Sequence, residues 1–380
     1  MKSLLRDARG RQTEMVRLLG KFVRAESPSL DKAAVDRFAR LVAAEWRRRG
    51  ARVQFLRQRH RGDHVRGEWW PGTGKPKGQL LLLGHMDTVY DVGTLARMPF
   101  RIRGGRAYGP GTFDMKGGLV IALFALDALR RAGLAPRKRV VCLWTTDEEI
   151  GSESSRALIE REAKRSDAVL VLEPANGQDG RVKTARKGVG DVEIVVIGRA
   201  AHAGLNPEAG VNAVHELALQ IAQVMKFGEP SRGITVNVDV VEGGTRSNVI
   251  AERARAVVDL RVSHARDAAR LERRFRSLRP ILRGAKLEVR GGISRPPMER
   301  TQGVERLFLH ARRLAEAMGI PLGESFVGGG SDGNFTAALG VPTLDGLGAA
   351  GEGAHSPGEC VLVGKLPERV ALVAGLLATL

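Results

Sequence analysis

The chain has 380 residues, of which 43% are hydrophobic and 27% charged, so it is long enough for two globular domains with a large core. No stretch approaches the ~20 apolar residues of a membrane span. The N-terminal ten residues become charged before an apolar signal core can form, so we expect a cytoplasmic protein without a membrane partner. Two cysteines, Cys142 and Cys360, are too few for a disulfide framework.

The net charge of +19 raises the question of nucleic-acid binding. The basic residues are scattered along the chain, however, and aromatic residues, which stack on bases, make up only 4%. We therefore expect no nucleic-acid partner. A positive field could instead attract small anionic substrates, or be only a solvated basic surface.

The first half of the chain alternates between helical and apolar strand patterns. Helical periodicity covers two early segments, and Gly50 is a plausible stop for the second. Continuous apolar runs predict strands that are buried on both faces. The predicted helices are 13–26, 30–49, 115–132 and 152–164, and the predicted strands are 52–57, 64–70, 80–83, 140–145 and 168–172. This alternation predicts a mostly parallel sheet covered by helices on both faces, an α/β fold.

The pattern changes after residue 187. Strands at 189–197, 233–241, 249–263 and 285–290 and helices at 207–226 and 266–277 give the order β-α-β-β-α-β, a ferredoxin-like split unit. We read 188–294 as an inserted α+β domain. Residues 1–187 and 295–380, where helix and strand alternation resumes, would form the two parts of the first domain.

Acidic and histidine side chains follow the apolar runs of the first domain. They are His85, Asp87, Asp114, Glu148, Glu149 and Glu173, and His355 follows far downstream. Open α/β sheets place ligands at the carboxyl ends of their strands, so these donors are expected to converge on one metal site, with room for two ions.

Each of these residues alone has a simpler explanation. His85 and Asp87 share one face of a strand, yet could be a strand-end histidine with a solvated aspartate. Asp114 could be a helix N-cap. Glu148 and Glu149 could supply negative charge before a helix, and Glu173 could lie on the surface. Together, this oxygen-rich set with two histidines suits Zn²⁺, with Co²⁺ or Mn²⁺ also acceptable.

Five segments in the same order also resemble a known family. They are Gly-His-Met-Asp-Thr-Val, Gly-Thr-Phe-Asp-Met-Lys-Gly-Gly, Thr-Asp-Glu-Glu-Ile-Gly-Ser, Glu-Pro and Ala-His-Ser-Pro-Gly-Glu. The chain resembles the di-zinc exopeptidase and amidohydrolase family of carboxypeptidase G-type glutamate carboxypeptidase, acetylornithine deacetylase, succinyl-diaminopimelate desuccinylase and aminoacylase. The resemblance implies a zinc-exopeptidase-like sheet between helices and an inserted lid and dimerisation domain.

The resemblance also implies a role for each residue at the predicted site. His85 and Glu173 would bind one Zn²⁺, Glu149 and His355 the other, and Asp114 would bridge them, often followed by a cis peptide. Asp87 would orient His85. Glu148 would be the general base and then the general acid.

The resemblance extends to a second group of residues. His202 would reach the active site of the other subunit of a homodimer and stabilise an oxyanion. Asn248, Arg261 and Lys187 would bind the substrate, and Gly329 and Gly330 would line its pocket with backbone amides. Each of these residues also has a simpler explanation. His202 could be a surface histidine, and Arg261 and Asn248 could form an ordinary salt bridge and a strand cap. Lys187 could be a surface lysine at a hinge, and the two glycines could form a turn.

The implied reaction is hydrolysis of an amide bond in a small peptide or N-acyl amino acid. A glutamate carboxypeptidase-like activity that releases a C-terminal amino acid fits best, and an N-acyl amino acid deacylase is the alternative. A different enzyme is also conceivable, because Gly329 to Gly333 fits the G-x-S-x-G nucleophile elbow. Ser331, Asp345 and His355 would then form a triad, which would leave the upstream carboxylates unexplained.

Overall fold

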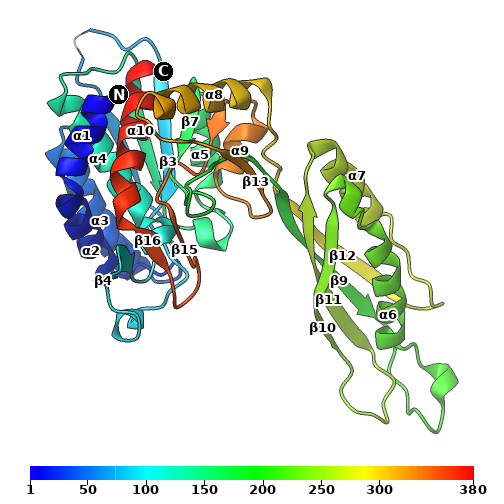
Figure 1. The fold of residues 1–380 in the computed structure, drawn as a ribbon. Helices are drawn as coiled ribbons and strands as arrows, with labels where there is room; N and C mark the ends of the chain where they lie inside the picture. Colours follow the sequence, from blue (N-terminus) through cyan, green and yellow to red (C-terminus); the bar gives the residue numbers. More distant parts are fainter. Residues whose placement is uncertain (73) are drawn as a thin grey trace. The chain divides into compact units, whose positions relative to one another are not determined.

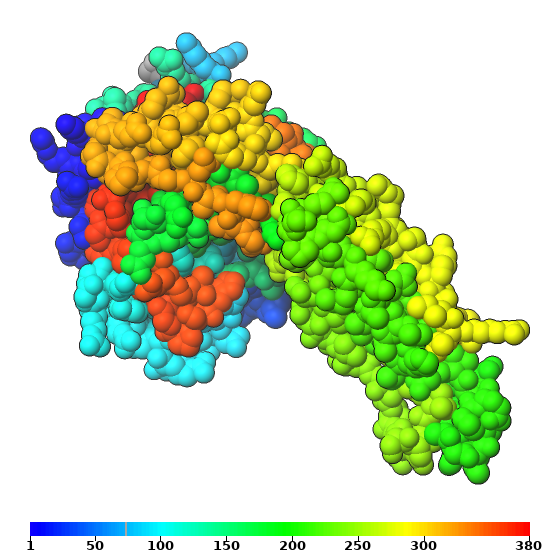
Figure 2. Space-filling model, turned by 45° about the vertical axis from the view of Figure 1, so that its right-hand side comes forward, coloured from blue at the N-terminus to red at the C-terminus, as the bar shows by residue number. Residues whose placement is uncertain are grey.

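The computed structural model describes residues 1–72 and 74–380 and divides into two compact units. The first unit comprises Met1–Ala185, Arg300–Phe326 and Ser331–Leu380, and the second comprises Arg186–Glu299 and Val327–Gly330. Both ends of the chain, blue and red, therefore belong to the first unit, and the second unit is made of the green to yellow middle (Figures 1 and 2). The second unit contains the segment 188–294 that we propose as an inserted domain.

A six-stranded mixed sheet forms the centre of the first unit. Its strands in spatial order are β1 (Arg52–Leu56), β2 (His64–Trp69), β6 (Arg139–Thr145), β3 (Gln79–His85), β7 (Ala168–Val171) and β14 (Thr343–Leu344). The last four are parallel to one another, whereas β1 and β2 add an antiparallel edge. Leu83 pairs with Leu143 of β6 and Val171 of β7, so the carboxyl ends of three strands lie side by side.

Alternating side chains of the central strands explain why helices cover both faces of this sheet. Leu80 and Leu82 of β3 belong to a large core with helices on one face, whereas Leu81 and Leu83 belong to a smaller core on the other. The first face is covered by α1 (Lys2–Gly10), α2 (Gln12–Val23), α3 (Lys32–Arg48), α4 (Gly117–Arg131), α8 (Gln302–Glu316) and α10 (Leu366–Thr379), and the second by α5 (Arg156–Ala163) and α9 (Gly333–Ala338) (Figure 1). The predicted α/β architecture is confirmed.

The first unit differs from the sequence-based expectations at two helices. The helix α1 was not predicted, because its arginines obscure a short buried stripe of Leu4, Leu5 and Ala8. The helix expected from residue 152 begins only at Arg156, since Glu148–Ile150 form a separate 3₁₀ turn and Ser152 has a positive φ of 59°.

Short strands that were not predicted individually build two small sheets. One contains β15 (Gly351–Glu352), β16 (Cys360–Leu362), β5 (Arg106–Tyr108) and β4 (Arg101–Arg103) in that order, and the other pairs β8 (Val182–Arg186) with β13 (Glu324–Val327). The first of these sheets pairs Cys360 with Tyr108, and it thereby joins two distant parts of the sequence.

The second unit contains the expected β-α-β-β-α-β order. It is formed by β9 (Gly188–Ile197), α6 (Ala213–Val224), β10 (Thr235–Gly243), β11 (Arg253–Val262), α7 (Ala265–Arg276) and β12 (Lys286–Arg295). Its antiparallel sheet has the order β10-β11-β9-β12. The helix expected from residue 207 begins at Ala213, because the Asn212 side chain caps the backbone N–H groups of Val214 and His215.

None of the helices within residues 1–72 and 74–380 has the length and apolar character needed to cross a bilayer. The apolar helices α4 and α10 instead bury their side chains in the core of the first unit.

Candidate metal centre

The predicted ligands lie where strands of the first unit end and where loops meet them. His85 is the last residue of β3, Glu173 follows β7 by two residues, and Glu148 and Glu149 form the turn after β6. Asp114 lies in the irregular segment Thr112–Lys116 just before α4. His355 has a positive φ of 59° and lies in the loop between β15 and β16.

The structure brings these residues together around Asp114. The Nε2 atom of His85 is 3.1 Å from Asp114 Oδ1 and 3.4 Å from Glu173 Oε1. The Nε2 atom of His355 is 3.1 Å from Glu149 Oε2 and 3.5 Å from Asp114 Oδ2. The two carboxylate oxygens of Asp114 therefore face two different histidines.

Glu148 completes the cluster. One carboxylate oxygen of Glu148, a ring nitrogen of His85 and an oxygen of Glu173 all lie within 4.8 Å of one another. The same holds for donor atoms of His85, Asp114 and Glu149. The peptide bond between Asp114 and Met115 is cis, as the family resemblance implied.

Burial and mutual contact shift the pKa values of the cluster. Burial lowers the pKa of His85, but hydrogen bonds to Asp114, Asp87 and Glu173 outweigh it and raise that pKa well above its usual value. The hydrogen bond to Glu149 raises the pKa of His355 to about 9. Burial raises the pKa of Glu149.

The donor set fits divalent cations. Four carboxylates surround only two imidazoles, so the site holds an excess of negative charge. Within the described part of the chain, the buried Oε1 atom of Glu149 has no hydrogen-bond partner. A buried carboxylate oxygen without a partner is costly, and a cation at this position would satisfy it.

Asp87 connects the end of β3 to the turn that carries Glu148 and Glu149. The Nδ1 atom of His85 is 3.0 Å from the Asp87 backbone oxygen and 3.5 Å from its Oδ1. The Asp87 carboxylate also accepts hydrogen bonds from the Ser29 hydroxyl at 2.7 Å and from the backbone N–H groups of Glu148 and Glu149 at 3.4 and 3.3 Å. Asp87 is thus placed to orient both His85 and the acidic turn.

Several supporting residues of the site were not predicted from the sequence, among them Ser29 and Lys116. The Lys116 ammonium is buried, donates to the backbone oxygens of Phe22 and Ala25 at 3.2 and 2.9 Å, and lies 4.5 Å from the centre of the Phe38 ring. Burial lowers the pKa of Lys116 to about 7. The Met-Lys-Gly-Gly motif was noted, but nothing in it indicated that its lysine would turn inward.

The predicted substrate-binding residues lie in the second unit. His202 is exposed, and its Nδ1 accepts hydrogen bonds from the backbone N–H groups of Gly204 and Leu205, both at 3.1 Å. This pattern assigns the remaining ring proton to Nε2, which makes that atom a donor. The backbone N–H of Ala203 bonds to the oxygen of Asn248 at 3.0 Å, so the segments of His202 and Asn248 are neighbours.

The other predicted substrate residues have contacts of their own. Arg261 points its Nε and Nη2 at Asp259, at 3.0 and 2.7 Å. The carbonyl oxygens of Gly329 and Gly330 accept hydrogen bonds from the Arg186 guanidinium. The backbone N–H of Lys187 bonds to Val327. These contacts show how the residues are held, and their part in substrate binding stays a prediction.

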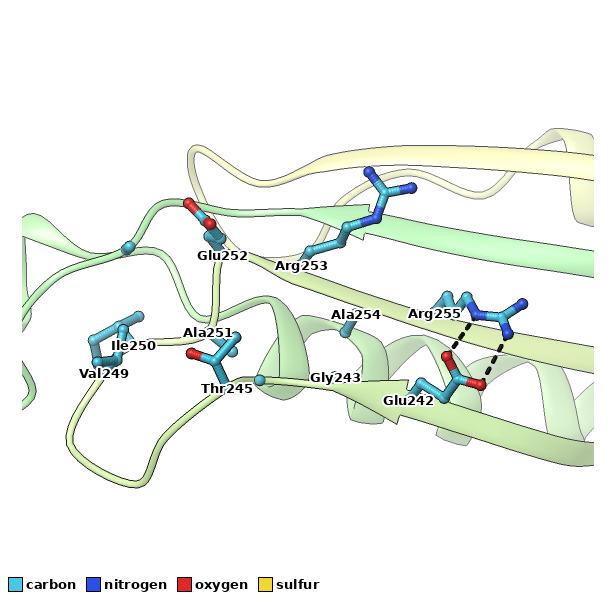
Figure 3. Close-up of a pocket in the computed structure, with 12 residues that line it drawn as sticks. Glu242, Gly243, Thr245, Val249, Ile250, Ala251, Glu252, Arg253, Ala254 and Arg255 are labelled. Carbon is cyan, nitrogen blue, oxygen red and sulfur yellow. Dashed lines mark hydrogen bonds and ion pairs between the residues drawn. The ribbon is translucent and has the colours of Figure 1, made fainter.

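A pocket of about 560 Å³ lies in the second unit beside the segments of His202 and Asn248 (Figure 3). Ala200, Val249 and Ile250 contribute to its lining, together with the ion pair between Glu242 and Arg255. The pocket contains none of the residues of the candidate metal centre.

The nucleophile-elbow alternative is wrong. Ser331 is fully buried, and its hydroxyl donates directly to Asp345 at 2.6 Å. His355 instead contacts Glu149 and Asp114. No histidine therefore lies between this serine and its aspartate, as a triad requires.

Comparisons with known proteins agree with the geometry. The chain is 33% identical to carboxypeptidase G2 from Pseudomonas sp. (strain RS-16), over 99% of this chain and 92% of that protein. It is 33% identical to acetylornithine deacetylase from Salmonella paratyphi B, but over only 50% of this chain and 51% of that protein.

Solved structures share the fold. The aminopeptidase PepT from Bacillus cereus superposes with a TM-score of 0.79 at 23% identity and covers 97% of this chain and 98% of its own. The YXEP protein from Bacillus subtilis, described as a dinuclear metal-binding peptidase, gives a TM-score of 0.68 at 14% identity, with 97% and 98% covered. Residues 81–379 match peptidase family M20/M25/M40. The chain therefore belongs to this family of metal-dependent hydrolases.

Proposed function

We propose that this hydrolase is a two-metal glutamate carboxypeptidase-like enzyme, which releases a C-terminal amino acid from a small peptide or N-acyl amino acid. The observation that carries the proposal is the position of Asp114, whose two oxygens face His85 and His355 separately. A carboxylate in this position can bridge two cations.

His85 and Glu173 would hold one Zn²⁺, and Glu149 and His355 would hold the second, with Asp114 shared between them. Co²⁺ or Mn²⁺ could replace zinc at such a donor set. When bound, the ions would supply Lewis acidity and would lower the pKa of a water molecule towards neutrality.

The protein residues would move the protons and hold the reactants. Glu148 accepts a proton from the attacking water and later donates it to the leaving amine. Asp87 keeps His85 and the backbone of Glu148 in place through the contacts described above. His202, with its Nε2 as donor, stabilises the negative charge that develops on the carbonyl oxygen.

Substrate selection would depend on the second unit. Asn248, Lys187 and Arg261 would bind the substrate carboxylate, and Arg261 would exchange its contact with Asp259 for that carboxylate. Gly329 and Gly330 would contribute backbone to the pocket. The similarity to carboxypeptidase G2 along 99% of the chain supports this substrate class. The similarity to acetylornithine deacetylase supports an N-acyl amino acid deacylase as the second candidate.

The test begins with protein stripped of metal by a chelator and reloaded with Zn²⁺. Its activity is then measured on N-acyl-glutamates, peptides with C-terminal glutamate, N-acetylornithine and simple dipeptides. We expect release of C-terminal glutamate to give the highest kcat/KM. Preference for N-acetylornithine would favour the deacylase, and equal activity with and without metal would contradict the whole proposal.

We further propose a homodimer formed through the inserted domain, in a cytoplasmic enzyme. If His202 acts on the partner subunit, Glu148→Gln and His202→Asn variants are each inactive as homodimers. Mixing them after dissociation would create heterodimers with one complete site. Since half of the random pairs are heterodimers, about a quarter of the wild-type activity should return. No recovery, with mixed dimers demonstrated, would argue against the action of His202 across subunits.

A further inference from the structure

Glu359 lies beneath the loop that carries Asp114. Its side chain is fully buried. Its Oε1 accepts hydrogen bonds from the backbone N–H groups of Phe113 at 2.8 Å and Asp114 at 2.9 Å, and its Oε2 accepts one from Gly111 at 3.1 Å. One carboxylate therefore satisfies three backbone donors of a single loop.

The same residue belongs to the segment of His355, four positions upstream. The backbone N–H of Glu359 bonds to the oxygen of Ser356 at 3.1 Å, and its own carbonyl accepts from Gly109 at 3.3 Å. The Tyr90 hydroxyl also donates to the Ser356 oxygen, at 3.0 Å. The loop of His355 is thus folded onto Glu359, and Glu359 in turn holds the loop of Asp114.

The irregular backbone explains why a carboxylate is needed here. Asp114 and Met115 have non-helical φ and ψ values, so the N–H groups before them cannot all bond to a preceding helical turn. Buried N–H groups without partners are costly, and hydrogen bonds to an ionised acceptor are stronger than those to a neutral one. A buried carboxylate has two oxygens and can accept hydrogen bonds from all three backbone N–H groups, those of Gly111, Phe113 and Asp114.

We propose that Glu359 is a positioning residue that sets the spacing between Asp114 and His355. This spacing allows the Asp114 carboxylate to face both His85 and His355. This inference rests on the proposed two-metal function. We call the three hydrogen bonds from Gly111, Phe113 and Asp114 to this carboxylate the Glu359 brace.

Two substitutions separate the reach of the side chain from its charge. Glu359→Asp keeps the negative charge but is one methylene shorter, so it cannot meet all three N–H groups without moving a loop. Glu359→Gln keeps the length and one accepting oxygen, but turns an NH₂ group towards a backbone N–H. Glu359→Ala removes the brace altogether. The control is Glu352→Gln at the end of β15, because that exposed carboxylate forms its side-chain contacts with Arg106 and Gln178 and takes no part in the Glu359 brace.

The measurements are metal stoichiometry, the dissociation constant of each bound ion and the visible absorption spectrum of the Co²⁺-loaded protein. Residues that orient metal ligands typically contribute 10–100-fold to metal affinity. We expect Glu359→Ala and Glu359→Asp to weaken binding of one ion roughly 10–100-fold and to change the Co²⁺ spectrum. Glu359→Gln should lie between them and the wild type, and Glu352→Gln should match the wild type.

The outcomes distinguish the inference from its alternatives. Wild-type affinity in the Asp variant would show that charge, rather than the brace, matters. Lower stability of the metal-free protein, with unchanged affinities and spectrum in all variants, would reduce Glu359 to an ordinary structural residue. If the Ala variant does not fold, the Asp and Gln variants decide. A wild-type protein that binds no divalent ion would instead refute the proposed function.

Discussion

The two adjacent glutamates of the acidic turn should respond in opposite ways to the same substitution. Glu148 contributes an oxygen near His85 and Glu173, whereas Glu149 contacts His355 and has a buried oxygen without a partner among the described residues. Glutamine has nearly the same size as glutamate, so Glu148→Gln and Glu149→Gln change charge and basicity and leave the packing intact.

The structure sets the expected magnitudes. The contact of Glu148 with Asp87 uses the backbone N–H, so it survives the substitution and the turn stays in place. Loss of a general base costs typically 10²–10⁴-fold in rate, or roughly 3–5 kcal/mol of activation free energy. Glu148→Gln should therefore keep two metal ions per chain and lose at least about 100-fold in kcat. Glu149→Gln should weaken one ion by more than the ~10–100-fold expected of a residue that only orients a ligand.

The assay combines metal analysis after dialysis against a defined Zn²⁺ buffer with steady-state kinetics on the best substrate from the panel. Excess Zn²⁺ should restore part of the activity of the Glu149 variant and none of that of the Glu148 variant. A Glu148→Gln variant that loses a metal ion, but keeps the wild-type turnover rate per bound metal pair, would refute the role given to Glu148. A Glu149→Gln variant that retains both ions at wild-type affinity would refute the role given to Glu149.

Three further predictions concern stability. Gly118→Ala should destabilise the fold by about 3 kcal/mol, because a Cβ would lie 2.1 Å from the Leu172 backbone oxygen. Gly364 has open space around it, so the control variant Gly364→Ala should stay within ~0.5 kcal/mol of wild type. Urea unfolding of both variants measures the difference. Burial lowers the pKa of His64 below its usual 6.5, although the nearby Asp147 carboxylate opposes this shift. As the pH falls, the histidine is therefore protonated in the unfolded chain before it is protonated in the folded protein. The free energy of unfolding should thus decrease as the pH drops below about 6.5. The free-energy difference between wild type and His64→Gln should therefore shift against the wild type on acidification, and a difference independent of pH from 7.5 to 5.5 would contradict this. Chelation of the metals should lower the melting temperature measured by calorimetry. Zn²⁺ at 1,000 times its dissociation constant should raise the free energy of unfolding by about 4 kcal/mol per site. An unchanged melting temperature after chelation would count against a metal centre.

The candidate site was predictable because its residues follow strong strand patterns. The buried runs that end at His85, Thr145 and Val171 are long and apolar, and the parallel pairing places their ends at one edge of the sheet. The strand patterns could not place His355 at the site, because nothing in its local sequence indicates that it meets Asp114. Only the family motifs predicted this residue as a ligand.

The residues that escaped prediction depend on long-range pairing. β15 and β16 have two and three residues, too few for any periodicity, and β16 finds β5 about 250 positions away in the sequence. Glu359 lies next to this pairing, so its three backbone partners could not be inferred from its neighbours in the chain. Arg261 is a different case, because the ordinary salt bridge that the sequence left open is present, with Asp259 two residues away on the same strand face, and its part in substrate binding stays a prediction.

The inward position of Lys116 has a consequence for how much of the chain the enzyme requires. The family match begins at residue 81, yet the oxygens that receive the Lys116 ammonium belong to Phe22 in the last turn of α2 and to Ala25, two residues after its end. Ser29, which donates to Asp87, comes from the same stretch. A truncated version that starts at the family boundary would remove both backbone acceptors of the Lys116 side chain and the hydroxyl donor to Asp87, so we expect the first thirty residues to be needed for an intact candidate metal centre.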